Sequence, residues 1–163
     1  MQKTQPIRDT NDIQRFKQYY LDRQQIRNYT MVTLGMNTSL RIGDLLNLKW
    51  KDVYDFQNIC FCKHLRVLEQ KTEKQNMIAL NQEALLALEY LRRSLVSISE
   101  NNYLFQSREG KNRPITRVQA FRIIKTAAEE LHFEGTISCH SLRKTFGYHA
   151  WKKGTPTALI MNI

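Results

Sequence analysis

The sequence predicts a mainly α-helical domain with one small antiparallel β-sheet, an α+β fold. Apolar residues recur at the three- and four-residue spacing of helices over most of the chain. A single stretch, from Ile59 to Leu68, instead alternates apolar and polar residues as a strand does. The length of 163 residues suits one hydrophobic core, so we expect a single domain over residues 1–163.

Three helices are expected in the first third of the chain. The first follows the polar start at Thr10 and keeps helical apolar spacing as far as Tyr20. The second covers Ile26 to Met36, and the third runs from about Ser39 to Leu48 and ends near Trp50.

The alternating stretch predicts one strand of a hairpin. Its faces would carry Ile59, Phe61, Leu65 and Val67 on one side, and Cys60, Cys62, His64 and Arg66 on the other. A polar turn covers residues 69–75, and the apolar segment from Met77 to Leu80 is the expected partner strand.

The second half of the chain predicts helices again. Asn81 can cap a helix with Ala84, Leu85, Leu88 and Leu91 on its apolar side. A capping box at Thr116 begins a helix that extends to about Leu131. A helix from about Ser138 to Lys153 ends at Gly154, and the start of one more covers residues 157–163.

The composition points to a polyanionic partner. Lys and Arg number 25 against 15 Asp and Glu, which gives a formal net charge of +10. Nucleic acid is therefore the first expected partner and an acidic membrane surface the second. No apolar run has the length of a membrane span and no signal-peptide core follows Met1, so we expect a cytoplasmic protein that does not enter a membrane. The three cysteines are expected to be reduced.

Two short segments about a hundred residues apart each place an arginine in a helical stretch. They are Leu40-Arg41-Ile42-Gly43-Asp44-Leu45-Leu46 and His140-Ser141-Leu142-Arg143. Each guanidinium is a planar fork that matches two phosphate oxygens and stays protonated at working pH. His140 and Arg143 are three residues apart, so one helix face would present both. Two forks and a histidine suit the charge that develops on a phosphate during cleavage.

Together with their apolar surroundings, from Thr38 to Trp50 and from His140 to Phe146, these segments resemble the tyrosine recombinase (phage integrase) family. The resemblance implies the fold of that family's catalytic domain, of the short integrase-like type. It also implies site-specific recombination or integration of double-stranded DNA, by strand cleavage and rejoining through a 3′-phosphotyrosyl intermediate. Assembly as a tetramer on DNA and the lack of any metal or small-molecule cofactor are implied in the same way.

The resemblance assigns roles to individual residues. Arg41 and Arg143 would clamp the scissile phosphate, and His140 would shuttle a proton. Asp44 would be a supporting carboxylate that steadies the site. Lys71, in the predicted hairpin turn, would be the general acid that protonates the 5′ oxygen. Lys74 is the alternative general acid, because a shift of three residues within one turn is open from the sequence alone.

Two family features are missing from the 163 residues. The second His or Trp and the nucleophilic Tyr would fall just after Ile163 by family spacing, and Tyr148 shares a helix with Arg143, where the nucleophile is not expected. We therefore expect a catalytic domain that lacks this C-terminal segment and is inactive without it. No separate N-terminal core-binding domain is expected either.

Two other interpretations fit part of the sequence. A non-catalytic DNA-binding relative that regulates recombination sites would also be basic, although such a protein has no need for convergent arginines and a proton-transfer group. Cys60, Cys62 and His64 could bind zinc if they share a strand face, but a fourth ligand at the usual spacing is absent from the sequence.

Overall fold

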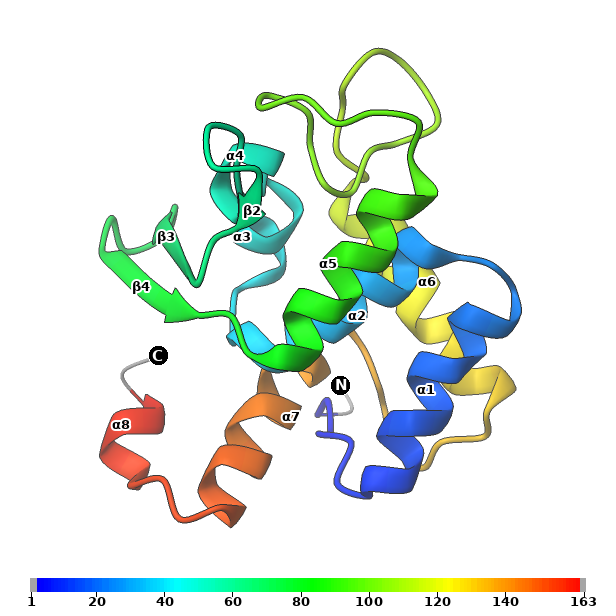
Figure 1. Cartoon of the computed structure of the whole chain (residues 1–163). Coiled ribbons are helices and arrows are strands. Elements are labelled where there is room, and N and C mark those ends of the chain that lie inside the picture. Colours follow the sequence, from blue (N-terminus) through cyan, green and yellow to red (C-terminus); the bar gives the residue numbers. More distant parts are fainter. Residues whose placement is uncertain (1–2, 162–163) are drawn as a thin grey trace.

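The computed structural model describes residues 3–161, and helices dominate it (Figure 1). The five longer helices are α1 (Thr10–Asp22), α2 (Ile26–Thr38), α5 (Gln82–Ser94), α6 (Arg117–Glu130) and α7 (Cys139–Lys152). The shorter ones are α3 (Ile42–Leu46), α4 (Trp50–Val53) and α8 (Thr157–Met161). The predicted mainly α fold with a small antiparallel component is confirmed. Within residues 3–161, no helix has both the length and the apolar character needed to cross a membrane.

Helix α2 forms the centre of the core. It packs against α1, α3, α5 and α7 (Figure 1). Most of its side chains are buried, including Met31, Val32 and Leu34. The buried hydroxyl of Thr30 donates to the backbone carbonyl of Ala87, so α5 is also attached by a polar contact. Burial of each large apolar side chain stabilises the fold by about 1.5–3 kcal/mol, and a helix buried on most sides fixes all its neighbours.

Helix α7 packs closely on α2 at Gly35. A Cβ atom built on Gly35 would sit 2.6 Å from Cδ1 of Leu142, so any larger residue here would force the Leu142 side chain to move. The middle of α7 is also held by the N-terminal segment, because the backbone N–H of Ile7 donates to Oγ1 of Thr145 at 2.9 Å. The residue after Leu142 is Arg143, so this packing sets the position of a candidate site residue.

The antiparallel structure consists of two separate hairpins. Strand β1 (Tyr54–Asp55) pairs with β2 (Cys60–Phe61), and β3 (His64–Leu68) pairs with β4 (Gln75–Ala79) with Leu68 opposite Gln75. The continuous strand predicted from Ile59 to Leu68 is therefore wrong. Ile59 has a positive φ of 51° and is 77% exposed, as a turn residue, and the alternation of faces starts afresh at His64.

The expected third helix is also shorter than predicted. Ser39 ends α2 with a left-handed φ of 60°, and Arg41 has an extended backbone and caps α3. A second short helix begins at Trp50, where the sequence had suggested an end, because the Trp50 ring is buried and its backbone N–H donates to the carbonyl of Asn102. The structure describes helix α8 as far as Met161, and the predicted helix residues 162–163 lie outside the described residues.

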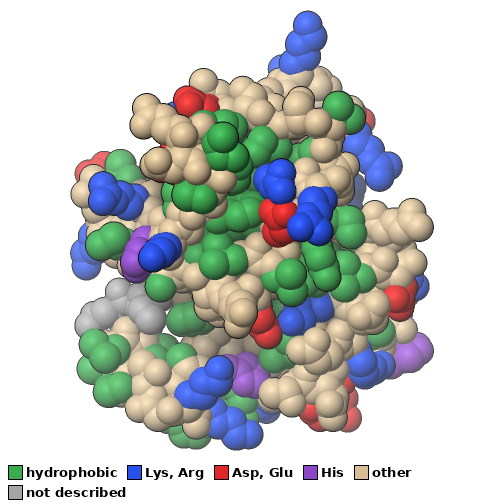
Figure 2. All heavy atoms as spheres, in the orientation of Figure 1, with side chains coloured by type: hydrophobic (Ala, Val, Ile, Leu, Met, Phe, Trp, Pro, Cys, Tyr) green, Lys and Arg blue, Asp and Glu red, His purple; other side chains and the backbone are tan. Residues whose placement is uncertain are grey.

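Charged side chains are dispersed on the face seen in Figure 2. Lys and Arg occur there at the rim and near acidic side chains, with apolar side chains between them. This face does not concentrate positive charge.

Candidate functional site

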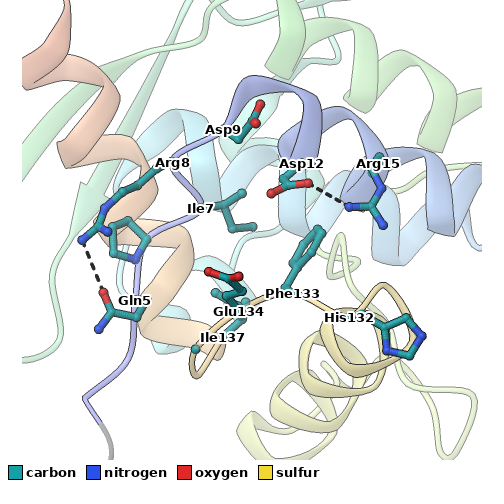
Figure 3. Close-up of a pocket in the computed structure, with 12 residues that line it drawn as sticks. Gln5, Ile7, Arg8, Asp9, Asp12, Arg15, His132, Phe133, Glu134 and Ile137 are labelled. Carbon is teal, nitrogen blue, oxygen red and sulfur yellow. Dashed lines mark hydrogen bonds and ion pairs between the residues drawn. The ribbon is translucent and has the colours of Figure 1, made fainter.

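A hollow of about 700 Å³ lies between the N-terminal segment, α1 and the loop that joins α6 to α7 (Figure 3). One of its arginines, Arg15, is already paired with Asp12 at 2.8 Å. Two arginines stand against three carboxylates along its wall, from Asp9, Asp12 and Glu134. Because the carboxylates outnumber the arginines, this hollow does not favour an anion.

A second hollow, of about 510 Å³, is lined by parts of the chain that are far apart in sequence. The start of α3, the β3–β4 turn and the starts of α6 and α7 surround it. Arg41, Lys71, His140 and Arg143 all line it, and so does Asp44. Arg117 also lines it, so four Lys and Arg side chains face the single carboxylate of Asp44. This excess of positive charge favours a polyanion.

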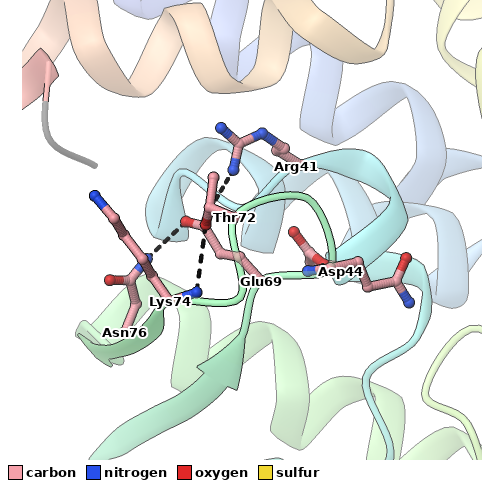
Figure 4. A network of polar contacts seen from close by, with 7 residues as sticks. Arg41, Asp44, Glu69, Thr72, Lys74 and Asn76 are labelled. Carbon is pink, nitrogen blue, oxygen red and sulfur yellow. Dashed lines mark hydrogen bonds and ion pairs between the residues drawn. The ribbon is translucent and has the colours of Figure 1, made fainter.

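Arg41 is held by a buried carboxylate. Its Nη1 forms an ion pair with Oε2 of Glu69, which is only 8% exposed (Figure 4). Burial alone would raise the pKa of Glu69, but the hydrogen bonds that it accepts from Thr72 and Arg41 lower this pKa. The positive charges of Arg41 and Arg143 act in the same direction, so the pKa lies below its usual value and the carboxylate stays ionised.

The β3–β4 turn is attached to α3 at a second point. Oδ1 of Asp44, a buried side chain, accepts a hydrogen bond of 3.2 Å from the backbone N–H of Gln70. Gln70 precedes Lys71, so Asp44 places the lysine-bearing turn beside the pocket. The role that the structure supports for Asp44 is therefore to hold this turn.

His140 and Arg143 come from the first turns of α7. Ser138 precedes the helix, and its backbone N–H donates to Oγ of Ser141 at 3.0 Å, which fixes the start of the helix. Both predicted residues line the pocket, and the N-terminal end of a 14-residue helix adds positive potential there. Burial and, after it, the charge of Arg41 lower the pKa of Arg143, while the guanidinium remains protonated at neutral pH.

The two candidate lysines of the turn differ in position. Lys71 is exposed and lines the pocket, whereas Lys74 is absent from its lining. The backbone carbonyl of Lys74 accepts a hydrogen bond of 3.0 Å from the N–H of Glu69, which closes the turn. The structure thus brings Lys71, and not Lys74, together with the two arginines.

Three residues of the site were not anticipated from the sequence: Glu69, Arg117 and Phe121. Arg117 is the first residue of α6, and its Nη2 would lie 2.5 Å from a Cβ atom on Gly43. A glycine at this position therefore allows the arginine to cross α3 and reach the pocket. Phe121, one turn later, is 42% exposed and forms an apolar edge. Gly43 inside a helical stretch was the one sequence signal for such a close approach.

Cys60, Cys62 and His64 do not lie on one face of a single strand, as a zinc site there would require. Cys60 belongs to β2 and His64 to β3, and the chain breaks its strand conformation between them. Within residues 3–161, no three His, Cys, Asp or Glu side chains gather in a group that could hold a metal ion.

Known proteins resemble this chain in sequence and in fold. The model of the phage integrase family matches residues 8–163, nearly the whole chain. The chain belongs to the phage integrase family. The probable integrase/recombinase YoeC of Bacillus subtilis (strain 168) is 38% identical to it, over 100% of this chain and 83% of that protein. The resemblance to tyrosine recombinases is confirmed.

Other family members are longer than this chain. The TnP I resolvase of Bacillus thuringiensis is 30% identical over 88% of this chain and 47% of its own length. The tyrosine recombinase XerD of Halalkalibacterium halodurans is 26% identical over 85% and 45%. This phage integrase family chain thus spans about half the length of these two relatives.

Solved structures of recombinases share the fold. The crystal structure of XerA recombinase superposes with a TM-score of 0.75 at 23% identity, over 98% of this chain and 56% of that one. A lambda integrase dimer bound to a COC′ core site gives 0.70 at 18% identity, over 95% and 43%. At these identities, the likeness establishes the fold of the phage integrase family chain and not its chemistry.

Proposed function

We propose that this chain binds double-stranded DNA and provides the phosphate-activating site for site-specific recombination by strand cleavage and rejoining. The observation that carries the proposal is the convergence of two arginines, a histidine and a lysine, from three separate parts of the chain, on one pocket. A phosphodiester under attack needs stabilisation on its non-bridging oxygens and on its leaving oxygen, and these side chains offer both.

Each side chain has one step in the proposed reaction. Arg41 and Arg143 bind the non-bridging oxygens of the scissile phosphate. A tyrosine oxygen attacks phosphorus and loses its proton to His140, while the bond from phosphorus to the 5′ oxygen breaks. Lys71 gives that oxygen a proton, and the products are a 3′-phosphotyrosyl link and a free 5′-hydroxyl. Rejoining reverses these steps without a cofactor, in the cytoplasm, within a tetramer on two duplexes.

The test supplies the nucleophile from solution. We expect hydrogen peroxide to act as a small nucleophile that nicks supercoiled plasmid in the presence of the chain. Replacement of Arg41 or Arg143 by alanine should abolish this nicking, because the phosphate is then held by a single fork. The matched control is Arg23→Ala, which removes an arginine bound to Glu130 at 3.2 Å on another face. Oxidative damage to DNA would be equal in all variants, so only a difference between them counts.

The same assay separates the two lysines. We expect Lys71→Ala to slow nicking by about 100-fold, in the range of general-acid catalysis, and Lys74→Ala to have a much smaller effect. If the chain binds plasmid and no nicking depends on Arg41 or Arg143, the non-catalytic DNA-binding alternative is favoured.

We also expect the 163-residue polypeptide to form no covalent adduct with DNA. All seven of its tyrosines lie within the described residues, and none lines the pocket. Incubation with nicked duplexes that trap a phosphotyrosyl intermediate, followed by a denaturing gel, measures this directly, with an XerD recombinase as the positive control. An adduct formed by this polypeptide would identify one of its own tyrosines, Tyr148 included, as the nucleophile and contradict the expectation.

A further inference from the structure

Glu69 is the most completely bound carboxylate near the pocket. Its Oε2 accepts from Arg41 Nη1 and, at 2.8 Å, from the hydroxyl of Thr72. Its Oε1 accepts from the side-chain amide of Asn76 at 2.6 Å (Figure 4). Both oxygens are therefore used, and the side chain is almost fully buried. A buried charge keeps such a position only where its partners compensate for lost hydration.

The backbone of Glu69 also shapes the turn that carries Lys71. Its N–H donates to the carbonyl of Lys74 at 3.0 Å, and its carbonyl accepts from the N–H of Glu73 at 2.8 Å. Glu69 thus closes the turn with its backbone and binds the guanidinium of Arg41 with its side chain.

The ion pair leaves most of the arginine fork for a phosphate. Among the contacts of the described residues, Arg41 gives Glu69 only Nη1, and its side chain is 33% exposed at the pocket. Glu69 keeps two further hydrogen bonds that do not involve Arg41, so a bound phosphate can share the guanidinium without expelling the carboxylate.

From this geometry, and resting on the proposed function, we infer that Glu69 is a positioning residue. It orients the Arg41 fork towards the scissile phosphate and holds the Lys71 turn beside it. It does so as a fixed carboxylate that remains in place when DNA binds. A single side chain in this way positions both Arg41, which binds the phosphate, and the turn that carries Lys71.

The test shortens the carboxylate without removing its charge. Glu69→Asp keeps the negative potential that DNA meets, whereas loss of the charge in Glu69→Gln would raise DNA affinity by itself and hide the effect. We expect Glu69→Asp to weaken binding of the full chain to a labelled duplex by about five-fold, because the charge-assisted hydrogen bond to Arg41 is lost. Glu73→Asp is the matched control, since it makes the same chemical change in the same turn and leaves Arg41 untouched.

A double-mutant cycle separates positioning from a general loss of structure. In the Arg41→Ala background, Glu69→Asp should have a clearly smaller effect on affinity, because only its hold on the Lys71 turn is then left to lose. An equal loss in both backgrounds, or no loss in either, would overturn the inference. If Arg41→Ala alone binds DNA like the unaltered chain, the proposed function fails, and this inference fails with it. The two failures are therefore distinguishable.

Hydrogen exchange tests the second half of the inference. Glu69→Asp should speed exchange at the backbone amides of Gln70 and Glu73, which the turn now protects, while α2 amides keep their rates. Unchanged exchange in the turn would overturn the link between Glu69 and Lys71. If Glu69→Asp fails to fold, Thr72→Val removes one hydrogen bond to the same carboxylate from an exposed site. That variant should weaken DNA binding by about two-fold, and by less when Arg41 is absent.

Discussion

The affinity of the chain for duplex DNA is expected to fall by about 150-fold between about 50 and about 200 mM monovalent salt. Four basic side chains line the pocket: Arg41, Lys71, Arg117 and Arg143. Each phosphate that they neutralise releases condensed counterions, so the logarithm of affinity should fall with that of salt at a slope of about −3.6. Fluorescence anisotropy of a labelled duplex over a salt series gives this slope.

Variants show whether the pocket accounts for the salt dependence. Arg117→Ala should make the slope less steep by about 0.9, because one phosphate contact is lost. Arg93→Ala should leave it unchanged, since Arg93 lies on α5 and already binds Glu89 at 2.7 Å. Two duplexes of unrelated sequence should differ little in affinity, because phosphate contacts carry no base information. A flat salt response would contradict the electrostatic account of binding.

The sequence predicted helices well where apolar spacing and caps agree. Asn81 accepts from the backbone N–H of Ala84 at 2.9 Å, and Thr116 from that of Gln119 at 3.1 Å, so the two capped helices begin where expected. It failed at Ser39 and Ile59. Both adopt a positive φ that their residue type does not favour, so the residue types gave no signal for the breaks there.

The pocket was only partly predictable for a similar reason. Arg41, Lys71, His140 and Arg143 stand in segments with a recognisable pattern, and the structure brings them to one place. Glu69 looked like one more polar residue of an exposed turn. Its burial depends on where the β3–β4 hairpin meets α3, and local spacing carries no information on such a contact between distant segments.

The largest expected effect on stability concerns the contact between α2 and α7. Leu142 is 2% exposed, and its Cδ1 and Cβ lie 2.6 and 3.2 Å from the position of a Cβ atom on Gly35. Leu142→Ala should lower the free energy of unfolding by about 3 kcal/mol, since it loses buried contacts and leaves a cavity. Gly35→Ala should lower it by about 1 kcal/mol, because overpacking outweighs the better helix propensity of alanine.

The double variant distinguishes this contact from two independent losses. With Leu142 shortened, the methyl group of an alanine at position 35 fills part of the cavity instead of colliding with a side chain. We therefore expect the double variant to lose at least about 1 kcal/mol less than the sum of the single losses, measured by urea unfolding. Additive losses would show that the two residues do not act on each other.

Because Arg143 follows Leu142 on α7, a change in this packing also moves the guanidinium that the pocket needs. We accordingly expect Gly35→Ala to weaken DNA binding even at temperatures at which the variant is fully folded.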